Sequence, residues 1–585
     1  MRRSLPLVFL LLAVACASVP APPPVHVVIV GTTDVHGWFN GHVDTPPGGG
    51  EGVFWGGLPI FASYVEALRA ENDGRVVVVD SGDMFQGTLE SNLFEGEAVV
   101  RGYNIIGYSA AAIGNHEFDF GPVGPAAIAR EPGDDPLGAL KRNASMATFP
   151  LLSANMIEKS NGRTPNWSKR TTIVRSGGAR IGIIGISTPD TPNVTMASNV
   201  VGLEFTDPVP AILFAAQELR RQSVDAVIVI AHMGGRCTNL EDPHDDSSCE
   251  RGYDVMPLLE KIPPGSIDGF FAGHTHAQMR HYINGTPVLQ GASYSREFSM
   301  LDLWIDTKAK RVTKNELRPP TMICSFVYEG TEQCDPRTAA KGAKLVPRVF
   351  AGATIAPDAR VVNVIDPYLR KVAAKREEKV GIRTSAPFTR SYVAESSVGN
   401  LISDAMREFA GSDFGFMNSG GIRSDLRAGD LIYADIFAVS PFDNYLTVVT
   451  MTGAQVIDTI RLMSPGIRGI MQVSGLKYTL DAKKDEDKPF AERNRLVSVT
   501  FPDGSPLDPD KLYTVAMPDF VAAGGDGTQA VMSVIPRERV KTSYLKPVRD
   551  VLVDVLSREP QPLTPRIEGR ITMLNAPAKE TGEGE

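Results

Sequence analysis

Short runs of apolar, mostly β-branched residues recur along the first half of the chain. They lie at Val25–Val30, Val76–Asp80, Ile181–Ile186, Ala226–Ala231 and Gly269–Ala272. Runs of this length are typical of strands buried on both faces of an α/β sheet. Leu58–Ala70 and Pro210–Gln222 have helical patterns and lie between some of these runs. The pattern therefore predicts a domain of strand–loop–helix units.

The second half predicts another α/β unit. Ser397 can cap a helix with apolar positions at Val398, Leu401, Ile402, Ala405, Met406 and Phe409. Strand-like runs follow at Phe414–Met417, Leu446–Met451, Arg495–Phe501 and Tyr513–Met517. Between the halves, Asp366-Pro367 has the form of an N-cap followed by proline in the first turn. We therefore expect a linker helix over Asp366–Val380, with Gly381 at a hinge.

The N-terminus has the form of an export signal. Arg2 and Arg3 precede an apolar run from Leu5 to Ala15 that is too short to span a bilayer. The segment from Leu12 to Cys16 resembles a bacterial lipobox, which predicts a signal peptide over residues 1–15 and lipidation of Cys16. Cleavage after Ala15 or Ala17 by the ordinary export peptidase is the alternative. We expect a periplasmic or cell-surface protein with a Pro-rich tether over residues 16–24. This tether would join the protein to a lipid anchor, and the anchor would be its only contact with the membrane.

Composition and charge exclude several classes of protein. Of the 585 residues, 43% are hydrophobic and 22% are charged, which is ordinary for globular domains and excludes a multi-span membrane protein or wholesale disorder. The length requires at least two domains. The formal net charge is −9 and there is no basic stripe, so we expect no nucleic-acid partner.

Four cysteines remain besides Cys16, and they form two close pairs in the sequence. An even number in an exported chain predicts two local disulfides, Cys237–Cys249 and Cys324–Cys334. A zinc cluster is the alternative, although the spacing is not C-x-x-C and an oxidising compartment disfavours it.

Five short polar segments follow hydrophobic runs directly and hold five of the nine histidines. They are Thr32–Gly37, Asp80–Met84, Ile113–Asp119, Ala231–His232 and Ala272–His276. Loops at the carboxyl ends of strands gather at one edge of an α/β sheet, so these side chains should converge. In an extended strand, residues i and i+2 point to the same side, so Asp34 with His36, and His274 with His276, should each present two ligands.

Carboxylate and imidazole ligands suit Zn, Mn, Fe or Co better than calcium. The seven candidates exceed the needs of one tetrahedral ion, so two divalent ions that share a carboxylate are expected, with Zn or Mn favoured. The candidate metal ligands are Asp34, His36, Asp83, Asn115, His232, His274 and His276.

With these segments in this order, the sequence resembles the calcineurin-like metallophosphoesterases, and specifically the exported 5′-nucleotidase family. The resemblance extends from about Val25 to about Ile571. It implies a four-layer α/β/β/α sandwich with two metals over residues 25–350, a linker with a helix over 351–381, and a second α/β substrate-binding domain over 382–575. Residues 576–585 would be a tail.

The resemblance also assigns roles. Asp34, His36, Asp83 and His276 would hold one ion, and Asp83, Asn115, His232 and His274 the other. Relatives often have Gln or Asn where this chain has His276. A water activated by the two metals would attack phosphorus, His116 would stabilise the phosphate and protonate the leaving oxygen, and Asp119 would orient His116.

In the second domain, resemblance predicts the substrate pocket. Phe442 and Phe520 would stack a nucleobase, Asp526 would bind the ribose hydroxyls, and Asn418 and Arg423 would complete the pocket. Relatives carry further arginines just before the helix that begins near Ser397, whereas this chain has Ser391–Ser397 there, with Arg390 the nearest arginine. Its contact with phosphate should therefore be weaker or built differently.

The predicted function is metal-dependent hydrolysis of nucleoside 5′-monophosphates, with a nucleotide as the small-molecule partner. The close alternatives are a 2′,3′-cyclic-nucleotide phosphodiesterase with 3′-nucleotidase activity and a nucleotide-sugar hydrolase. A non-catalytic surface-binding protein on the same scaffold is the alternative of another class.

Overall fold

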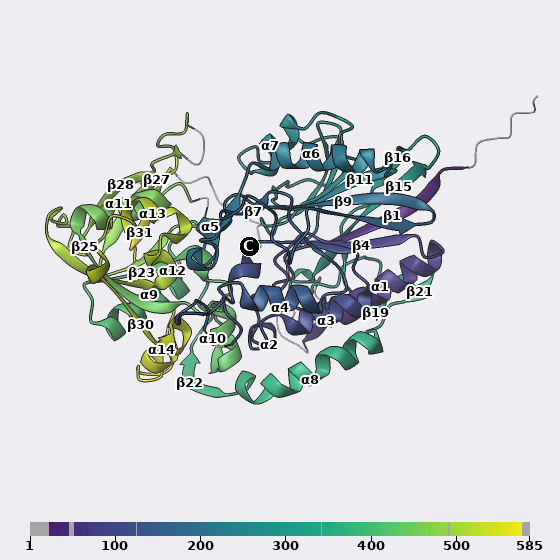
Figure 1. The fold of residues 1–585 in the computed structure, drawn as a ribbon. Coiled ribbons are helices and arrows are strands. Elements are labelled where there is room, and N and C mark those ends of the chain that lie inside the picture. Colours follow the sequence, from purple (N-terminus) through teal and green to yellow (C-terminus); the bar gives the residue numbers. More distant parts are fainter. Residues whose placement is uncertain are drawn as a thin grey trace, which may run out of the picture.

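The computed structural model describes residues 23–45, 52–124, 126–340, 342–466, 468–488 and 492–575. The predicted signal peptide, Cys16 and the tail lie outside the described residues. The described part forms two α/β units joined by helix α8 (Ala359–Arg376), which runs along the base of the first unit in Figure 1. Within this part, no helix combines the length and apolar character needed to cross a membrane.

Two sheets face each other in the first unit. Their strand orders are β16–β15–β1–β4–β5–β6, with β17 beside β15, and β13–β14–β12–β11–β9–β8. The first sheet comprises β1 (Val25–Thr32), β4 (Val76–Asp80), β5 (Ala110–Ala112), β6 (Leu151–Leu152), β15 (Glu297–Asp306), β16 (Arg311–Leu317) and β17 (Thr321–Met322). The second comprises β8 (Thr171–Ser176), β9 (Ala179–Ser187), β11 (Ala226–His232), β12 (Gly269–Phe271), β13 (Met279–Ile283) and β14 (Thr286–Gln290).

Alternate side chains of each strand enter different layers of the core. Val28 and Val30 of β1 pack with helices α1 (Leu58–Glu71) and α3 (Glu97–Ile106), whereas Val27 and Ile29 pack between the sheets. Helices α6 (Pro208–Arg221) and α7 (Val255–Lys261) cover the other side of the second sheet (Figure 1). The predicted four-layer α/β/β/α sandwich is confirmed.

Helix α8 begins earlier than predicted. The Asp358 side chain caps it by accepting from the backbone N–H of Arg360, and Pro367 lies inside the helix. Pro367 is exposed, so water can reach the carbonyl that loses its hydrogen bond there. Val361 and Ile365 belong to the core of the first unit, so α8 is docked on that unit.

The second unit contains a sheet of order β26–β23–β29–β25–β30 and a smaller one of order β28–β27–β31. Helix α9 (Ser397–Ala410) and helix α14 (Val548–Leu556) share one hydrophobic cluster, and α11 (Gly453–Met463) packs into another. The strands are β23 (Phe414–Asn418), β25 (Tyr445–Thr452), β26 (Met471–Ser474), β27 (Lys477–Asp481), β28 (Leu496–Thr500), β29 (Leu512–Pro518), β30 (Val540–Pro547) and β31 (Ile571–Leu574).

Two local predictions in this unit were wrong by a few residues. Ser396, not Ser397, caps α9, because its side chain accepts from the N–H of Gly399. Gly381 lies within strand β22 (Lys379–Thr384) instead of ending the linker helix. The domain boundaries at residues 350 and 382 stay a prediction.

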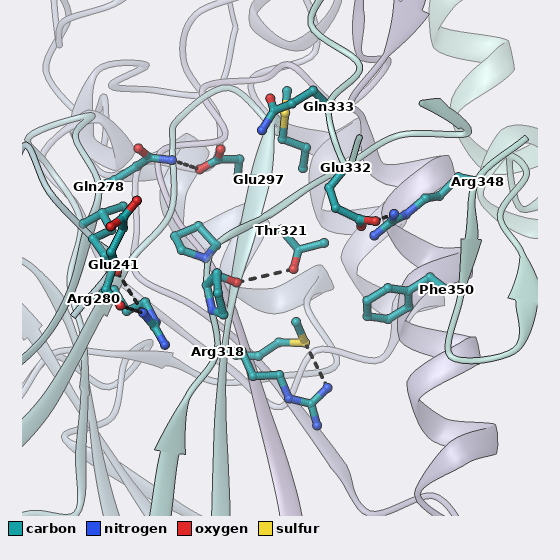
Figure 2. Close-up of a pocket in the computed structure, with 15 residues that line it drawn as sticks. Glu241, Gln278, Arg280, Glu297, Arg318, Thr321, Glu332, Gln333, Arg348 and Phe350 are labelled. Atoms are coloured by element: carbon teal, nitrogen blue, oxygen red, sulfur yellow. Dashed lines mark hydrogen bonds and ion pairs between the residues drawn. The ribbon is translucent and has the colours of Figure 1, made fainter. Parts of the chain in front are cut away.

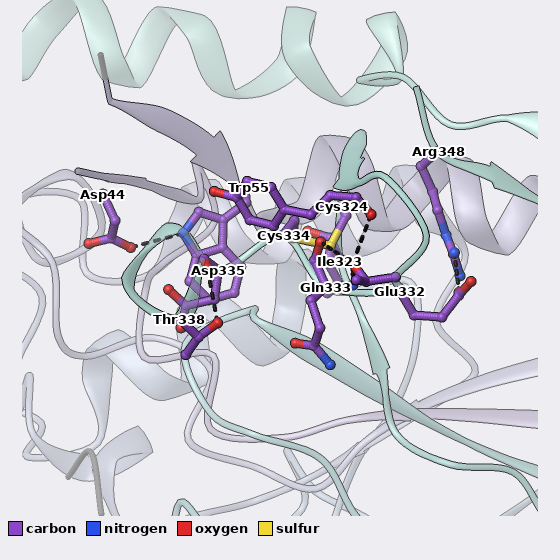
Figure 3. Close-up of a disulfide and its surroundings, with 12 residues drawn as sticks. Asp44, Trp55, Ile323, Cys324, Glu332, Gln333, Cys334, Asp335, Thr338 and Arg348 are labelled. Carbon is purple, nitrogen blue, oxygen red and sulfur yellow. Dashed lines mark hydrogen bonds and ion pairs between the residues drawn. A yellow bond between two sulfur atoms is a disulfide. The ribbon is translucent and has the colours of Figure 1, made fainter. Parts of the chain in front are cut away.

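The structure forms both predicted disulfides, Cys237–Cys249 and Cys324–Cys334. Figure 3 shows the second of these beside the buried indole of Trp55, whose Nε1–H donates to Asp44 Oδ2 at 2.9 Å. This disulfide closes a short loop after the first sheet, and it packs against Trp55 of the hairpin of β2 (His42–Asp44) and β3 (Val53–Trp55).

Candidate functional site

The five polar segments converge where the strands that precede them end. The strands β1, β4 and β5 are mutually parallel, as are β9, β11 and β12, so their carboxyl ends share edges. Two groups of side chains result, each with its ligand atoms within 4.8 Å of one another. They are Asp34 with His36 and His276, and Asp83 with His232 and His274.

Asp83 belongs to the second group and also lies next to His36 of the first. Its Oδ2 atom is 3.0 Å from His232 Nε2 and 3.6 Å from His36 Nε2, while Oδ1 accepts from the N–H of His116 at 2.8 Å. Asn115 Oδ1 lies 3.1 Å from His232 Nε2. The structure therefore brings all seven predicted ligands together, with Asp83 where a shared carboxylate was predicted.

The backbone that presents these ligands is unusual. Asp34, His36, Asp83, His274 and His276 all have positive φ angles, of 50°, 48°, 58°, 77° and 55°. Non-glycine residues rarely adopt this conformation, and such strain clusters at functional sites. The explanation from strand alternation was therefore wrong: these pairs lie beyond the ends of β1 and β12, and left-handed turns aim them.

Neighbouring carbonyl groups fix the histidine tautomers. His36 Nδ1–H donates to the carbonyl of Gln86 at 2.8 Å, and His232 Nδ1–H donates to that of Ser81 at 2.9 Å. Both rings therefore direct Nε2 into the site. Asn115 Nδ2–H donates to the carbonyl of Val194 at 2.9 Å, which turns its Oδ1 atom inward.

The charges in the site favour a bound cation. Burial opposes ionisation of Asp34 and Asp83, but neighbouring histidines keep both pKa values below the ordinary value. Burial also disfavours a charged His232, yet Asp83 raises its pKa to about 10, whereas burial lowers that of His274 to about 4. Two carboxylates, an amide oxygen and imidazoles are the mixed donors that Zn or Mn accepts, so the residues fit the expected ions, provided that His232 gives up its proton when an ion binds.

Glu117 holds this cluster together, although it was not among the predicted site residues. Its carboxyl group accepts from the N–H groups of Asp83 at 2.9 Å, Met84 at 2.6 Å and Gly114 at 2.6 Å. Burial, together with Asp83, raises the pKa of Glu117 to about 8. Glu117 therefore ties the loop after β4 to the loop after β5. Its place in the Asn-His-Glu sequence was the signal that could have identified it.

His116 and Asp119 form the predicted pair. His116 Nδ1–H donates to Asp119 Oδ2 at 2.5 Å, and Thr195 Oγ1–H donates to Asp119 Oδ1 at 2.7 Å. Burial opposes a charge on His116, but Asp119 and Asp83 raise its pKa. Nε2 is left free to meet a substrate.

The second unit places its predicted residues beside this cluster. The ring of Phe442 lies 5.5 Å from that of His116, and Arg423 Cζ lies 5.8 Å from the Phe442 ring. Asp526, at φ 52°, accepts from Asn418 Nδ2–H at 2.7 Å. Burial raises the pKa of Asp526 to about 6.

Phe520 lies in the same region but makes different contacts. A Cβ atom at Gly525 would come within 2.4 Å of the Phe520 ring, so the ring packs directly on that glycine. No ring contact joins Phe442 and Phe520 in the described part of the chain. A base between the two rings would have to occupy the space that separates them.

The units are held together near the site by an ion pair. Arg468 of the second unit donates to Asp190 Oδ2 of the first at 2.5 and 2.8 Å. Asn92 Nδ2–H also donates to the carbonyl of Pro441 at 3.0 Å, next to Phe442. The structure thus fixes the approach of Phe442 to His116.

A cavity of about 830 Å³ lies elsewhere, and none of the predicted site residues lines it. Figure 2 shows Arg318 and Arg348 in its wall. Arg318 pairs with Asp302 at 2.5 and 2.8 Å, and Arg348 pairs with Glu332. Arg280, the third arginine of the wall, donates to the carbonyls of Leu240, Glu241 and Leu317. Because all three arginines have partners, the cavity gives no indication of a ligand.

Comparison with known proteins identifies both units. Residues 27–278 match the family of calcineurin-like phosphoesterases, and residues 373–533 match the 5′-nucleotidase C-terminal domain. Protein UshA of Escherichia coli is 26% identical over 535 residues, which cover 86% of each chain. A 5′-nucleotidase of Vibrio cholerae is 26% identical over 556 residues, covering 88% of each.

A solved structure has the same fold. The crystal structure of a 5′-nucleotidase precursor from Thermus thermophilus superposes with a TM-score of 0.72 at 23% identity, covering 94% of this chain and 100% of that one. The two domain matches together show that this chain is a phosphoester hydrolase of the 5′-nucleotidase family, with a calcineurin-like metallophosphoesterase domain followed by a 5′-nucleotidase C-terminal domain.

Proposed function

We propose that the protein hydrolyses nucleoside 5′-monophosphates to nucleoside and phosphate, with two divalent ions, Zn or Mn, as cofactors. The observation that carries this proposal is that residues of the metal-ligand cluster lie next to predicted substrate-binding residues of the second unit. Asp83 and His116 come from the metal-ligand cluster, and Arg423 and Phe442 come from the second unit.

The predicted ligands fit two ions that share Asp83. Asp34, His36 and His276 would complete one site, and Asn115, His232 and His274 the other. Bound there, the ions would neutralise charge on the phosphoryl oxygens and acidify the attacking water.

His116 would serve as the proton donor. Its Nδ1–H is engaged by Asp119, so the Nε2 proton is the one available to the substrate. As the bond from phosphorus to the 5′ oxygen breaks, this proton passes to that oxygen and the nucleoside leaves as an alcohol. Asp119, held by Thr195, stabilises the charged imidazole while the proton is bound.

The second unit would supply specificity. Phe442 and Phe520 would stack the base, Asp526 would accept hydrogen bonds from the ribose hydroxyls, and Asn418 would orient Asp526. Arg423 would bind the phosphoryl group as a forked cationic donor. Because an aromatic face stacks on any base, purine and pyrimidine nucleotides should both fit.

We also propose that the protein is exported and anchored through a lipid on Cys16. The two disulfides support export, because such bonds persist in oxidising compartments outside the cytoplasm.

A substrate panel tests the function. The purified full chain would be assayed on AMP, 2′,3′-cyclic AMP and UDP-glucose with added Mn²⁺ or Zn²⁺, and after chelation. We expect metal-dependent release of phosphate from AMP. Preference for 2′,3′-cyclic AMP or UDP-glucose would favour one of the two alternative hydrolases. Stoichiometric metal without hydrolysis of any of the three would favour a non-catalytic binding protein.

A further inference from the structure

Two tyrosines that the proposed mechanism does not use lie at the candidate site. Tyr294 belongs to the loop between β14 and β15, in the first unit. Its ring lies 5.1 Å from the ring of His276 and 5.6 Å from that of His36. Tyr392 comes from the segment before α9, in the second unit. The two phenols therefore approach the site from different units.

The backbone fixes Tyr294 in a strained conformation. Tyr294 and Ser295 have φ angles of 65° and 55°, in the left-handed region that favours glycine. The Tyr294 N–H donates to the carbonyl of Asp34 at 2.7 Å, and its carbonyl accepts from His42 Nε2–H at 2.6 Å. Gly57 N–H donates to the carbonyl of Ser295 at 3.0 Å. Strain that is held by so many contacts is typical of a functional residue.

Two glycines make room for Tyr392. A Cβ atom at Gly469 would lie 3.3 Å from its ring, and one at Gly420 would lie 3.3 Å from its hydroxyl oxygen and 3.4 Å from Asp526 Oδ2. Arg423 Nη1–H donates to the carbonyl of the same Gly420 at 3.3 Å. The hydroxyl of Tyr392, the carboxylate of Asp526 and the guanidinium of Arg423 therefore meet around Gly420.

Arg423 connects the phenols to the metal-ligand cluster. Burial opposes its charge, but Tyr294, Tyr392, Asp83 and Asp34 together raise the pKa of Arg423. Burial also raises the pKa of Tyr392, so that this phenol keeps its proton at neutral pH. In the described part of the chain, neither phenol hydroxyl forms a hydrogen bond.

We propose that the hydroxyls of Tyr294 and Tyr392 donate hydrogen bonds to the non-bridging oxygens of the substrate's phosphoryl group, on either side of Arg423. The two tyrosines would then bind phosphate as neutral donors and add no positive charge to the site. This inference rests on the proposed function only in that the substrate is a phosphate ester, because the two hydroxyls would contact phosphate and not the base.

The test uses Tyr294→Phe, Tyr392→Phe and the double variant, which remove the hydroxyls and keep the rings. Inhibition by inorganic phosphate, the KM for p-nitrophenyl phosphate and for AMP, and the metal content would be measured. Loss of one neutral hydrogen bond should weaken phosphate inhibition and raise each KM about threefold to tenfold, with the effects multiplying in the double variant. Metal content should stay the same and kcat should change less than KM.

Tyr328→Phe is the matched control. It removes a hydroxyl that also forms no hydrogen bond but belongs to strand β18 (Phe326–Tyr328), between the two cysteines of the Cys324–Cys334 disulfide, so it should leave phosphate inhibition unchanged. The proposal is overturned if the two single variants keep phosphate inhibition within twofold of the parent protein. It is also overturned if every variant that binds phosphate more weakly has also lost metal. The tyrosines would then support the metal ligands instead of binding phosphate.

The substrates separate this inference from the proposed function. If AMP is not cleaved, but hydrolysis of p-nitrophenyl phosphate depends on both hydroxyls, the inference stands and the proposed function fails. If AMP is cleaved with an unchanged KM in both variants, the proposed function stands and the inference fails.

Discussion

The imidazole of His116 lies beside the phenyl ring of Phe442, with the ring centroids 5.5 Å apart. His116 comes from the phosphoesterase unit and Phe442 from the C-terminal unit. The group proposed to protonate the leaving oxygen therefore touches a residue proposed to bind the base. A site built in this way requires both units to be in place before it can act.

His116→Ala should slow hydrolysis of AMP without releasing metal. The side chain pairs with Asp119 and lies beside Phe442, and its hydrogen bond to the proposed ligand Asp83 comes from the backbone N–H alone. A positioned general acid contributes about 100-fold to 10,000-fold to the rate, so kcat should fall by that range. Metal analysis and steady-state kinetics check this, with the exposed His244→Ala as the control. An unchanged kcat, or loss of metal, would contradict the role.

Phe442→Ala and Phe520→Ala should each raise the KM for AMP about 5-fold to 150-fold. This is the loss of affinity expected when one stacking contact with a base is removed. The KM for p-nitrophenyl phosphate, which has no base, should change far less. Phe409→Ala, which alters a ring that is 45% exposed, is the control. Equal losses for both substrates would show that the rings shape the phosphate site instead of binding a base.

Nucleoside binding should depend on the ionisation of Asp526. Burial raises its pKa to about 6, so it is neutral below that pH and a carboxylate above it. Inhibition by adenosine should strengthen from about pH 5 to about pH 8, because the carboxylate accepts better from the ribose hydroxyls. Adenosine does not titrate in this range.

Asp526→Asn should bind adenosine weakly and without the step near pH 6. The same pKa has a consequence for stability, because the folded carboxyl holds its proton more tightly than the unfolded one. Ionisation of Asp526 should therefore lower stability as the pH rises from about 4 to about 6. If the parent protein and Asp526→Asn showed the same pH dependence of inhibition, Asp526 would not be the ribose ligand.

The double variant Cys324→Ser with Cys334→Ser should destabilise the phosphoesterase unit by about 2–4 kcal/mol, mainly because its unfolded chain gains freedom. The bond also borders the buried Trp55 and the Tyr64 hydroxyl, which donates to the carbonyl of Cys324 at 3.0 Å. Calorimetry should show a lower unfolding midpoint for this unit and an unchanged midpoint for the C-terminal unit. Identical midpoints for the variant and the parent protein would refute this.

Much of the metal-ligand cluster could be predicted from order along the chain. Asp34, Asp83 and His232 each follow a run of valine and isoleucine, and parallel strands bring their carboxyl ends together. Local signals were less dependable. Asp366-Pro367 has the form of a helix start, but an exposed proline is tolerated inside α8.

Other features depend on contacts between distant segments, and no local pattern encodes them. Glu117 binds N–H groups of a loop that begins more than thirty residues earlier. Tyr294 is aimed by bonds to Asp34 and His42, and its left-handed conformation has no sign in the sequence Ser-Tyr-Ser.

The central claim is that Asp83 is shared by two metal ions that the reaction requires. Metal content and AMP turnover of Asp83→Asn, measured on the same preparation, test this most directly, with the exposed Asp245→Asn as the control. The account predicts two ions per chain in the parent protein, a marked loss of metal in Asp83→Asn, and a fall in kcat of at least about 1,000-fold. An Asp83→Asn protein that keeps both ions and full turnover would contradict it.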